Sequence, residues 1–307
     1  MNLLITGGCG HIGSYLIHNI NKIHKIRKTY VIDNFKSTNI NSLFNLNKKN
    51  KINFYQIDLT KKNFLKNFKN IDYVIHLASM TNAAGSFNKK NEMYKNNIGC
   101  LKNIIDFCIK NKSKLIHISS TSVYGKQTNL VDETCEKKYL KPQSPYADIK
   151  LIEERMLKKE SNNLSYITYR FGTISGISTG MRFHTAVNKF CLDASLNRNI
   201  SIYKTALHQF RPYLSLKDSF KLFKFTIEND LFNNDIYNAL SENCTVNQII
   251  QKIKKFKKNI KIKFVSSEIM NQLSYHVDKK KLNNEGILLN SKIENDVRDT
   301  LNLLKYI

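Results

Sequence analysis

The stretch Thr6-Gly7-Gly8-Cys9-Gly10-His11-Ile12-Gly13 decides the fold of this chain. A short apolar run at residues 2–5 precedes it, as in a buried strand, and apolar residues recur at helical spacing over residues 12–20 after it. Glycines at positions 7, 10 and 13 suit a tight turn, close approach of the backbone to a phosphate, and close packing of helix on strand. We therefore predict a strand, a glycine turn and a helix whose first N–H groups bind the pyrophosphate of a dinucleotide.

An acidic residue stands where a dinucleotide-binding turn needs one. Asp33 ends the second apolar run, residues 30–32, and a carboxylate there accepts hydrogen bonds from an adenosine ribose and repels a 2′-phosphate. This favours NAD over NADP; the alternative is that Asp33 only caps a helix or lies in a loop. The pair Asp58-Leu59 follows the third apolar run and either contacts adenine or forms a solvated turn.

Strand-like and helical patterns alternate along the first half of the chain. Strand-like apolar runs lie at residues 52–57, 73–77, 114–119 and 164–169. Helical spacing separates them at residues 62–68, 92–110 and 146–159. The alternation predicts an α/β fold, a Rossmann-type doubly wound parallel sheet with helices on both faces and its ligand at the carboxyl ends of the strands.

After residue 172 the alternation becomes irregular, which indicates a second and smaller unit. We expect a helix over residues 182–196, a strand over 200–203, and helices near 217–229, 245–257 and 291–305. We predict an NAD-binding domain of residues 1–171 plus about 212–240. We predict that residues about 172–211 and 241–307 form a partly interleaved second domain that binds the substrate.

Composition limits the function further. The 307 residues carry 49 Lys and Arg against 24 Asp and Glu, a net charge of +25, but the lysines are spread along the chain with abundant Asn and Ile. This pattern favours a general compositional bias over nucleic-acid binding; a catalytically silent RNA-binding protein is the alternative. The apolar runs are too short for a membrane span, and the start lacks a secretory pattern. Six scattered cysteines without a C-x-x-C pair predict reduced thiols, no metal site and a cytoplasmic protein.

A serine cluster and a Tyr–Lys pair supply the chemistry. Ser119-Ser120-Thr121-Ser122-Val123-Tyr124-Gly125 ends one strand, and Ser144-Pro145-Tyr146-Ala147-Asp148-Ile149-Lys150 opens a helix. Tyr146 and Lys150 share one helix face. A free tyrosine, with a pKa of roughly 10, is a poor base, but Lys150, the helix N-terminus and an oxidised nicotinamide favour its phenolate. We predict that Tyr146 takes a proton from a sugar hydroxyl held by Ser120 while a hydride leaves the same carbon for NAD. The alternative is an amphipathic helix with a half-buried tyrosine.

The order of these motifs resembles the extended short-chain dehydrogenase/reductase family, in particular nucleotide-sugar epimerases and dehydratases such as UDP-galactose 4-epimerase. The resemblance spans nearly the whole chain. Besides T-G-x-x-G-x-x-G and Y-x-x-x-K, the matching segments are His76-Leu77-Ala78-Ser79, Asn97 with Asn103, Ser119 to Gly125, Arg170-Phe171 through Gly176, and Gln209-Phe210-Arg211-Pro212-Tyr213-Leu214-Ser215-Leu216-Lys217-Asp218.

The resemblance implies roles for individual positions. Ser120, Tyr146 and Lys150 take the catalytic places, with Lys150 also a ribose ligand. The residues that it places around NAD are Gly7, Gly10, His11, Ile12, Gly13, Asp33, Asn34, Asp58, Leu59, Leu77, Ala78, Ser79, Asn97, Ser119, Tyr146 and Lys150. Cys100 and Leu101 replace the Gly-Thr that usually follows Asn97 in the family.

The substrate side is marked by a different set of residues. Arg211 stands where the family puts an arginine on the nucleotide diphosphate, and a guanidinium suits phosphate oxygens. Arg182 and Asn188 are further candidates for this group; the alternatives are a solvated arginine and a helix-surface asparagine. The remaining substrate candidates are Ser120, Thr121, Thr173, where many epimerases have a substrate-touching Asn, and Tyr275, which is equally consistent with a helix cap.

The reaction follows from what the catalytic set contains. Dehydratases of the family that this chain resembles carry Asp or Glu directly after the catalytic Ser or Thr, as the general acid–base group for loss of water. This chain has Thr121 and Ser122 at those positions, so the sequence disfavours 4,6-dehydration. The set suffices for a nucleotide-sugar 4-epimerase with a 4-keto intermediate, in surface-glycan biosynthesis. It suffices equally for a 4-dehydrogenase or a 4-ketoreductase. The family resemblance also implies a homodimer through the helices at 92–110 and 147–160.

Overall fold

A parallel seven-stranded sheet forms the centre of the computed structural model, which describes residues 1–38, 40–61, 67–127, 130–266 and 275–306. Its strands are β1 (Asn2–Thr6), β2 (Lys28–Asp33), β3 (Ile52–Gln56), β4 (Tyr73–His76), β5 (Lys114–Ser120), β7 (Tyr166–Phe171) and β11 (Ile236–Ala239). The order β3-β2-β1-β4-β5-β7-β11 has every neighbouring pair parallel. This order confirms the predicted Rossmann-type doubly wound sheet.

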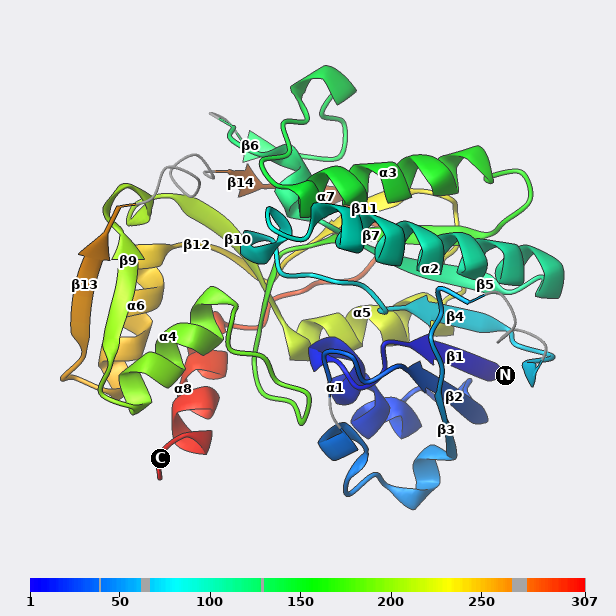
Figure 1. The fold of residues 1–307 in the computed structure, drawn as a ribbon, viewed down its shortest axis with the longest axis horizontal. Coiled ribbons are helices and arrows are strands. Elements are labelled where there is room, and N and C mark those ends of the chain that lie inside the picture. The colour runs from blue at the N-terminus through cyan, green and yellow to red at the C-terminus, as the bar shows by residue number, and fades with distance from the viewer. Residues whose placement is uncertain (39, 62–66, 128–129, 267–274, 307) are drawn as a thin grey trace.

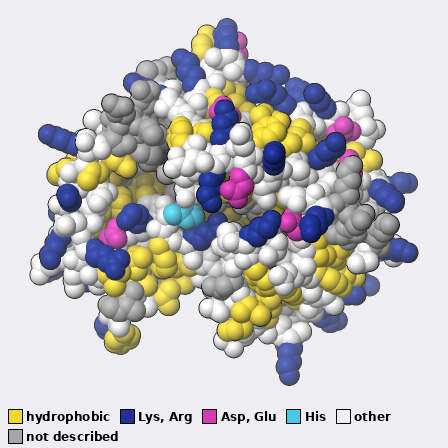
Figure 2. Space-filling view, in the orientation of Figure 1, with side chains coloured by type: hydrophobic (Ala, Val, Ile, Leu, Met, Phe, Trp, Pro, Cys, Tyr) yellow, Lys and Arg dark blue, Asp and Glu magenta, His cyan; other side chains and the backbone are white. Residues whose placement is uncertain are grey.

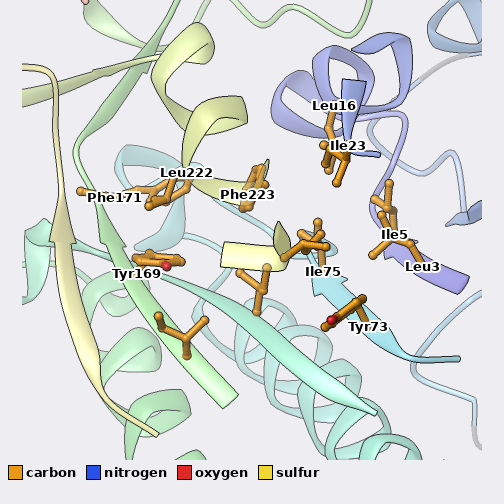
Figure 3. Close-up of a cluster of buried hydrophobic side chains, with 14 of the residues drawn as sticks. Leu3, Ile5, Leu16, Ile23, Tyr73, Ile75, Tyr169, Phe171, Leu222 and Phe223 are labelled. Carbon is orange, nitrogen blue, oxygen red and sulfur yellow. The ribbon is translucent and has the colours of Figure 1, made fainter. Parts of the chain in front are cut away.

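Helices cover both faces of the sheet (Figure 1). The pair α1 (His11–Asn19) and α5 (Leu216–Glu228) packs on one face, and the pair α2 (Lys90–Asn111) and α3 (Pro145–Lys159) on the other. Strand side chains alternate between two cores, so both faces are apolar. Leu3 and Ile5 join Leu16 and Phe223 in one core (Figure 3), whereas Leu4 joins the core under α2 and α3.

The predicted strands and most predicted helices lie within a few residues of the observed ones. The helix expected at residues 62–68 falls mostly on residues 62–66, which lie outside the described part of the chain. The helix expected from residue 182 is wrong at its start, because α4 (Ala186–Ser195) begins at Ala186. The preceding segment is held by other contacts: Gly180 N–H donates to Ser14 Oγ (2.9 Å) on α1.

A smaller unit lies beside the large sheet, with its own core. Its strands form a sheet in the order β12 (Glu242–Thr245), β10 (Phe210–Ser215) and β8 (Thr173–Ser175), and a pair of β9 (Asn199–Tyr203) with β13 (Lys261–Val265). Val187, Ile249 and Val297 bring α4, α6 (Val246–Phe256) and α8 (Ile293–Leu303) together in that core. The sequence patterns predicted β9 but not β8, β10, β12 or β13, and they also did not predict β11 in the large sheet.

Short elements complete the described chain. They are β6 (Leu130–Val131) paired with β14 (His276–Val277), α7 (Lys280–Asn284), and the 3-10 helices η1 (Ile20–Lys22), η2 (Ile40–Leu43), η3 (Lys48–Asn50), η5 (Ala84–Ser86), η6 (Thr121–Tyr124), η7 (Lys137–Tyr139) and η8 (Lys204–Ala206). Leu282, Ile287 and Leu289 pack in the same core as Leu3. We therefore propose the predicted division into domains with one change: residues 282–289 belong with the large sheet.

Surface and helix composition add three facts. Lys and Arg side chains are spread over the visible face rather than gathered in one stripe (Figure 2). Within the described ranges, we find no helix with the length and apolar character that a bilayer crossing requires. All six cysteines are free thiols, and every one except Cys135 is buried.

Candidate active site

The glycine turn joins β1 to α1 at the centre of the sheet, where the strand order reverses. The N–H groups of Gly7 and Gly8 donate to the carbonyl of Ile32 (2.7 and 3.3 Å), which ties the turn to β2. Gly7 has φ +68°, and a Cβ there would lie 2.6 Å from the Ala78 nitrogen. A Cβ on Gly13 would lie 2.5 Å from the Gly7 carbonyl oxygen. Both positions therefore require glycine for close packing.

Gly10 plays a different role from its neighbours. Its backbone is extended (φ −73°, ψ 178°), and a Cβ there would meet only the Gly7 carbonyl oxygen at 3.3 Å and Arg182 Nη2 at 4.0 Å. Gly10 is the N-cap residue of α1, and no side chain caps this helix end. The first N–H groups of a helix lack intrahelical partners and attract anions. The turn thus fits the predicted phosphate site, with an arginine beside it.

Arg182 lies at this turn rather than on a substrate surface of its own. Its guanidinium donates to Ser37 Oγ (3.2 Å) and Thr81 Oγ1 (3.4 Å), which follow β2 and β4. The segment that carries it is anchored nearby, because the His11 ring bonds the Gly176 carbonyl (Nε2–O, 2.9 Å). Burial lowers the pKa of His11 to about 4, so the ring is neutral at physiological pH. Residues 176–182 therefore cover the turn.

Asp33 ends β2 as predicted and is buried. Its carboxylate accepts hydrogen bonds from the N–H groups of Cys9 and Phe35 (both 3.0 Å) and from Thr38 Oγ1 (2.9 Å). Asp58 instead pairs with Lys36 (2.8 Å), at a more exposed position. Asp33 is thus joined directly to the glycine turn, where an adenosine ribose would reach it.

The loop after β4 closes the other side of the turn. Leu77 and Ala78 lie against Gly7, and Ser79 donates to the Met80 carbonyl (3.4 Å). The Asn97 amide on α2 bonds both the N–H (2.8 Å) and the carbonyl (3.1 Å) of Met80. Asn97 therefore braces this loop, and its direct contact with NAD stays a prediction.

The catalytic trio assembles where β5 and α3 meet. Ser144 caps α3 by accepting from Ala147 N–H (3.3 Å), with Pro145 at the first helical position as predicted. This cap places Tyr146 in the first turn of the helix, where the Ser120 side chain lies near enough to lower the pKa of the tyrosine hydroxyl. Lys150 Nζ lies 5.8 Å from the centre of the Tyr146 ring. The structure thus brings together the three residues predicted from two separate motifs.

The electrostatics of Tyr146 are less simple than predicted. Burial raises its pKa above the usual tyrosine value, and the Lys150 charge and the Ser120 side chain act to lower it. Glu153 and Tyr275 act to raise it. The expected help from Lys150 is present, but other groups of this chain oppose it.

Several buried polar residues were missed in the sequence. Glu153 bonds Lys150, and His117 on β5 bonds Glu153. Glu154 forms a buried two-point ion pair with Arg170 (2.9 and 2.7 Å) and accepts from Ser119 Oγ (2.6 Å). The hydroxyl of Ser119, a predicted cofactor ligand, is therefore engaged with Glu154. The sequence offered one indication of these pairs: Glu153 and Glu154 are adjacent carboxylates on the side of the helix that faces the sheet.

The substrate candidates fall into two groups. Thr121 donates to the Phe171 carbonyl (3.2 Å) and lies near the buried Tyr275, which in turn acts to raise the pKa of Tyr146. Arg211 is partly exposed on β10, and its charge acts on Tyr275. Asn188 is fully buried, accepts from Gly176 N–H (3.4 Å) and donates to the Arg182 carbonyl (3.2 Å). Its amide thus holds the segment over the glycine turn.

The last substrate candidate, Thr173, lies on β8 and is partly exposed. It pairs with Tyr213 in the smaller unit's sheet.

Comparison with known proteins gives one family. Residues 3–239 match the model of the NAD dependent epimerase/dehydratase family. A UDP-glucose 4-epimerase of Yersinia enterocolitica is 34% identical over 164 residues, which are 52% of this chain and 48% of that protein. A dTDP-D-glucose 4,6-dehydratase of Dictyostelium discoideum is 29% identical over 252 residues, 77% of this chain and 57% of the relative. The chain thus spans about half the length of these two curated relatives.

Solved structures share the whole fold. A UDP-N-acetylglucosamine 4-epimerase from Methanobrevibacter ruminantium, in complex with UDP-N-acetylmuramic acid, has a TM-score of 0.86 at 26% identity, covering 98% of this chain and 97% of the other. A Thermus thermophilus UDP-glucose 4-epimerase in complex with NAD has a TM-score of 0.86 at 19% identity, and the match covers 100% of this chain and 99% of the other. At such low identity, the second likeness shows the fold alone.

Proposed function

Since its family model covers most of the chain, the protein belongs to the NAD dependent epimerase/dehydratase family, and we propose that it is a nucleotide-sugar 4-epimerase. The family is described as NAD dependent, and we propose that this chain too is an enzyme with NAD as its cofactor. The observation that carries the finer proposal is the assembly of Tyr146, Ser120 and Lys150 beside a glycine turn with an acidic neighbour, Asp33.

The proposed chemistry is a reversible oxidation at one sugar carbon. NAD, when bound, supplies the acceptor and later the donor of a hydride. Tyr146 takes the proton of the C4 hydroxyl, and Ser120, whose side chain lies near the tyrosine hydroxyl, orients that group. Tyr146 returns the proton when the 4-keto sugar, turned over in the site, is reduced on its other face. No proton is gained or lost over the cycle.

Dehydration would require a further acid near the sugar. The residues after Ser120 offer none, because Thr121 donates to the Phe171 carbonyl and the Ser122 hydroxyl donates to Ser120 Oγ (2.9 Å). Neither hydroxyl has a pKa suited to general acid–base catalysis at neutral pH. We therefore favour the epimerase over the 4,6-dehydratase, and keep the 4-dehydrogenase and 4-ketoreductase as alternatives for the experiment below.

Roles for the binding residues follow from their positions. We propose that the glycine turn holds the pyrophosphate of NAD and that Asp33 accepts from the adenosine ribose. Arg182, beside Gly10, is reassigned from the sugar nucleotide to the phosphates at the turn. Arg211 stays the candidate for the substrate diphosphate. The other proposed cofactor contacts are His11, Ile12, Asn34, Asp58, Leu59, Leu77, Ala78, Ser79, Asn97 and Ser119, and the other sugar contacts are Thr121, Thr173 and Tyr275.

We further propose a homodimer formed through α2 and α3. These helices pack side by side, and Tyr94 and Ile152 line a shallow groove between them in which Tyr94 is 45% exposed. Free thiols suit a reducing compartment, so we propose a cytoplasmic location. A role in surface-glycan synthesis is a separate proposal that depends on the proposed nucleotide-sugar substrate. The RNA-binding alternative has the net charge in its favour, but Lys and Arg side chains are scattered over the face shown in Figure 2 rather than gathered in one patch.

One experiment tests the proposed function. Purified protein is incubated with UDP-, GDP-, CDP- and dTDP-sugars, and the products are identified by NMR while NADH is followed by absorbance. The proposal expects a C4 epimer of one substrate and no net NADH. Stoichiometric NADH with a ketone product would identify a dehydrogenase. A lack of any product, with RNA binding that weakens steeply between ~50 and 200 mM salt, would favour the binding protein.

A further inference from the structure

The catalytic lysine is not free in its pocket. Its ammonium donates to Glu153 Oε2 at 2.7 Å, three residues later on α3. The same oxygen lies 3.0 Å from His117 Nε2 on β5, and all three side chains are at most 5% exposed. An ionised carboxylate only accepts, so Nε2 of His117 carries the hydrogen. His117 Nδ1 then faces Thr168 Oγ1 (3.3 Å) on β7, which fixes the ring.

The Glu153 carboxyl is ionised in this arrangement. Burial by itself would raise its pKa, but the Lys150 charge and the hydrogen bonds from His117 and Lys150 lower it to about 2. Lys150 and Glu153 therefore form a buried pair with no net charge. The Lys150 charge still acts to lower the pKa of Tyr146, but the Glu153 charge acts against it.

His117, which contacts Glu153, also acts through its charge to lower the pKa of that carboxyl, and the further groups named here add no net positive charge beside the pair. Glu154, which also acts on Lys150, is balanced by its ion pair with Arg170. His76 on β4 is neutral at pH 7, because burial lowers its pKa to about 3. Cys100 on α2 stays a thiol, because burial raises its pKa to about 12. Tyr275, the remaining described group that acts on Tyr146, raises its pKa.

A reaction that runs in both directions needs a tyrosine that is a base in one half and an acid in the other. If Lys150 alone kept Tyr146 ionised, it would also make the protonated tyrosine a poorly matched acid when the proton taken from the sugar has to be returned. Because Glu153 offsets the charge of Lys150, the electrostatic potential at the Tyr146 hydroxyl depends chiefly on the charge of the group that binds beside it. The oxidised nicotinamide is a cation and the reduced ring is neutral, so ionisation of Tyr146 follows the state of the cofactor.

We propose that Glu153, oriented by His117, is a positioning and charge-balancing residue that keeps Tyr146 protonated until a cationic nicotinamide ring lies beside it. The inference rests on the proposed function, because it takes Tyr146 to be the acid and base of that reaction. It assigns a task to two side chains that neither the motifs nor the family comparison singles out.

The test measures Tyr146 itself in protein stripped of cofactor. Ultraviolet phenolate absorbance is followed against pH, and the same titration of the Tyr146→Phe protein is subtracted. We expect Glu153→Gln, which keeps size and an acceptor but removes the charge, to lower the midpoint by about one pH unit. Adding Lys150→Met to that variant is expected to cancel the drop. An unchanged or higher midpoint in Glu153→Gln would overturn the proposal.

A second measurement needs no variant at Glu153, in case that variant does not fold. In the wild-type chain, NAD⁺ is expected to lower the Tyr146 midpoint by about one pH unit or more, and NADH to leave it nearly unchanged. A wild-type protein whose Tyr146 is already ionised at neutral pH without cofactor refutes the charge balance.

Turnover separates this inference from the proposed function. The kcat–pH profile of the Glu153→Gln protein is measured with the nucleotide sugar that the wild-type protein turns over. Its acidic limb is expected to lie at lower pH than that of the wild-type protein, because the pKa of Tyr146 falls, with little change in KM. A merely structural role of Glu153 would not produce this shift. If the titrations behave as expected but no nucleotide sugar reacts, the proposed function fails while the charge balance stands. If sugars react and the midpoints do not move, only the role of Glu153 fails.

Discussion

Replacing Gly10 with alanine separates cofactor binding from folding. The extended backbone of Gly10 (φ −73°, ψ 178°) suits any residue, so alanine adds no backbone strain there. It also restricts the unfolded chain, which contributes about 0.4–1 kcal/mol to stability. The one close contact of the new Cβ, 3.3 Å from the Gly7 carbonyl oxygen, requires a shift of a few tenths of an ångström. These effects nearly cancel, and we expect the unfolding free energy to change by less than about 1 kcal/mol.

The same methyl group occupies the space where the phosphates are expected to approach the turn. Losing even one phosphate–backbone hydrogen bond to a charged group costs about 1.5–3 kcal/mol, so we expect NAD affinity to fall about tenfold to a hundredfold. Thermal unfolding and calorimetric titration with NAD measure the two quantities on one preparation.

Gly7→Ala is the matched control. There the Cβ would meet the Ala78 nitrogen at 2.6 Å with φ +68°, which strains the backbone by about 1–2 kcal/mol before the clash is counted. This variant should therefore lose stability as well as NAD binding. If Gly10→Ala binds NAD like the wild type, or if it unfolds as readily as Gly7→Ala, the reasoning about this turn is wrong.

Further predictions concern the buried charges and the substrate arginine. Glu154→Gln leaves Arg170 buried and unpaired, and should lower the free energy of unfolding by about 3 kcal/mol in a urea titration; a loss under about 1 kcal/mol would contradict it. Because burial lowers the pKa of His76 to about 3, the unfolded state alone binds that proton below pH 6.5. Stability should thus fall as pH falls, by about 2 kcal/mol at pH 5 from this group. His76→Asn should flatten that dependence in pH-resolved denaturation curves, and an unchanged dependence in this variant would contradict the prediction. Arg211→Ala should raise KM for the sugar nucleotide about tenfold or more, with a smaller effect on kcat; equal KM values would remove Arg211 from the substrate site.

The sheet and the catalytic trio could be predicted because both depend on local patterns. Most strands of the parallel sheet carry a short run of buried apolar residues, as at Leu3, Leu4 and Ile5 of β1, and the glycine turn and the capped helix of Tyr146 are set by residues within one or two turns of the chain. The strand order then brings the ends of β1, β4 and β5 together, so residues from distant motifs meet without any long-range signal in the sequence.

What could not be predicted depends on packing between distant segments. Arg182 reaches the glycine turn because residues 176–182 fold back over α1, and nothing in the local pattern distinguishes that path from an earlier start of α4. The pairing of Glu153 with His117 joins a helix to a strand 36 residues away along the chain. A sequence shows that a carboxylate follows Lys150, but only the fold shows that the two charges are buried against each other.

The most direct test of the proposed reaction follows the hydrogen at C4. The nucleotide sugar that the protein turns over is labelled with deuterium at that carbon, and the product is examined by NMR and mass spectrometry. The account predicts an epimer that keeps its deuterium at C4, with no such product from Tyr146→Phe protein that still binds NAD. A product that has exchanged this deuterium with solvent, or undiminished turnover by Tyr146→Phe, would contradict it.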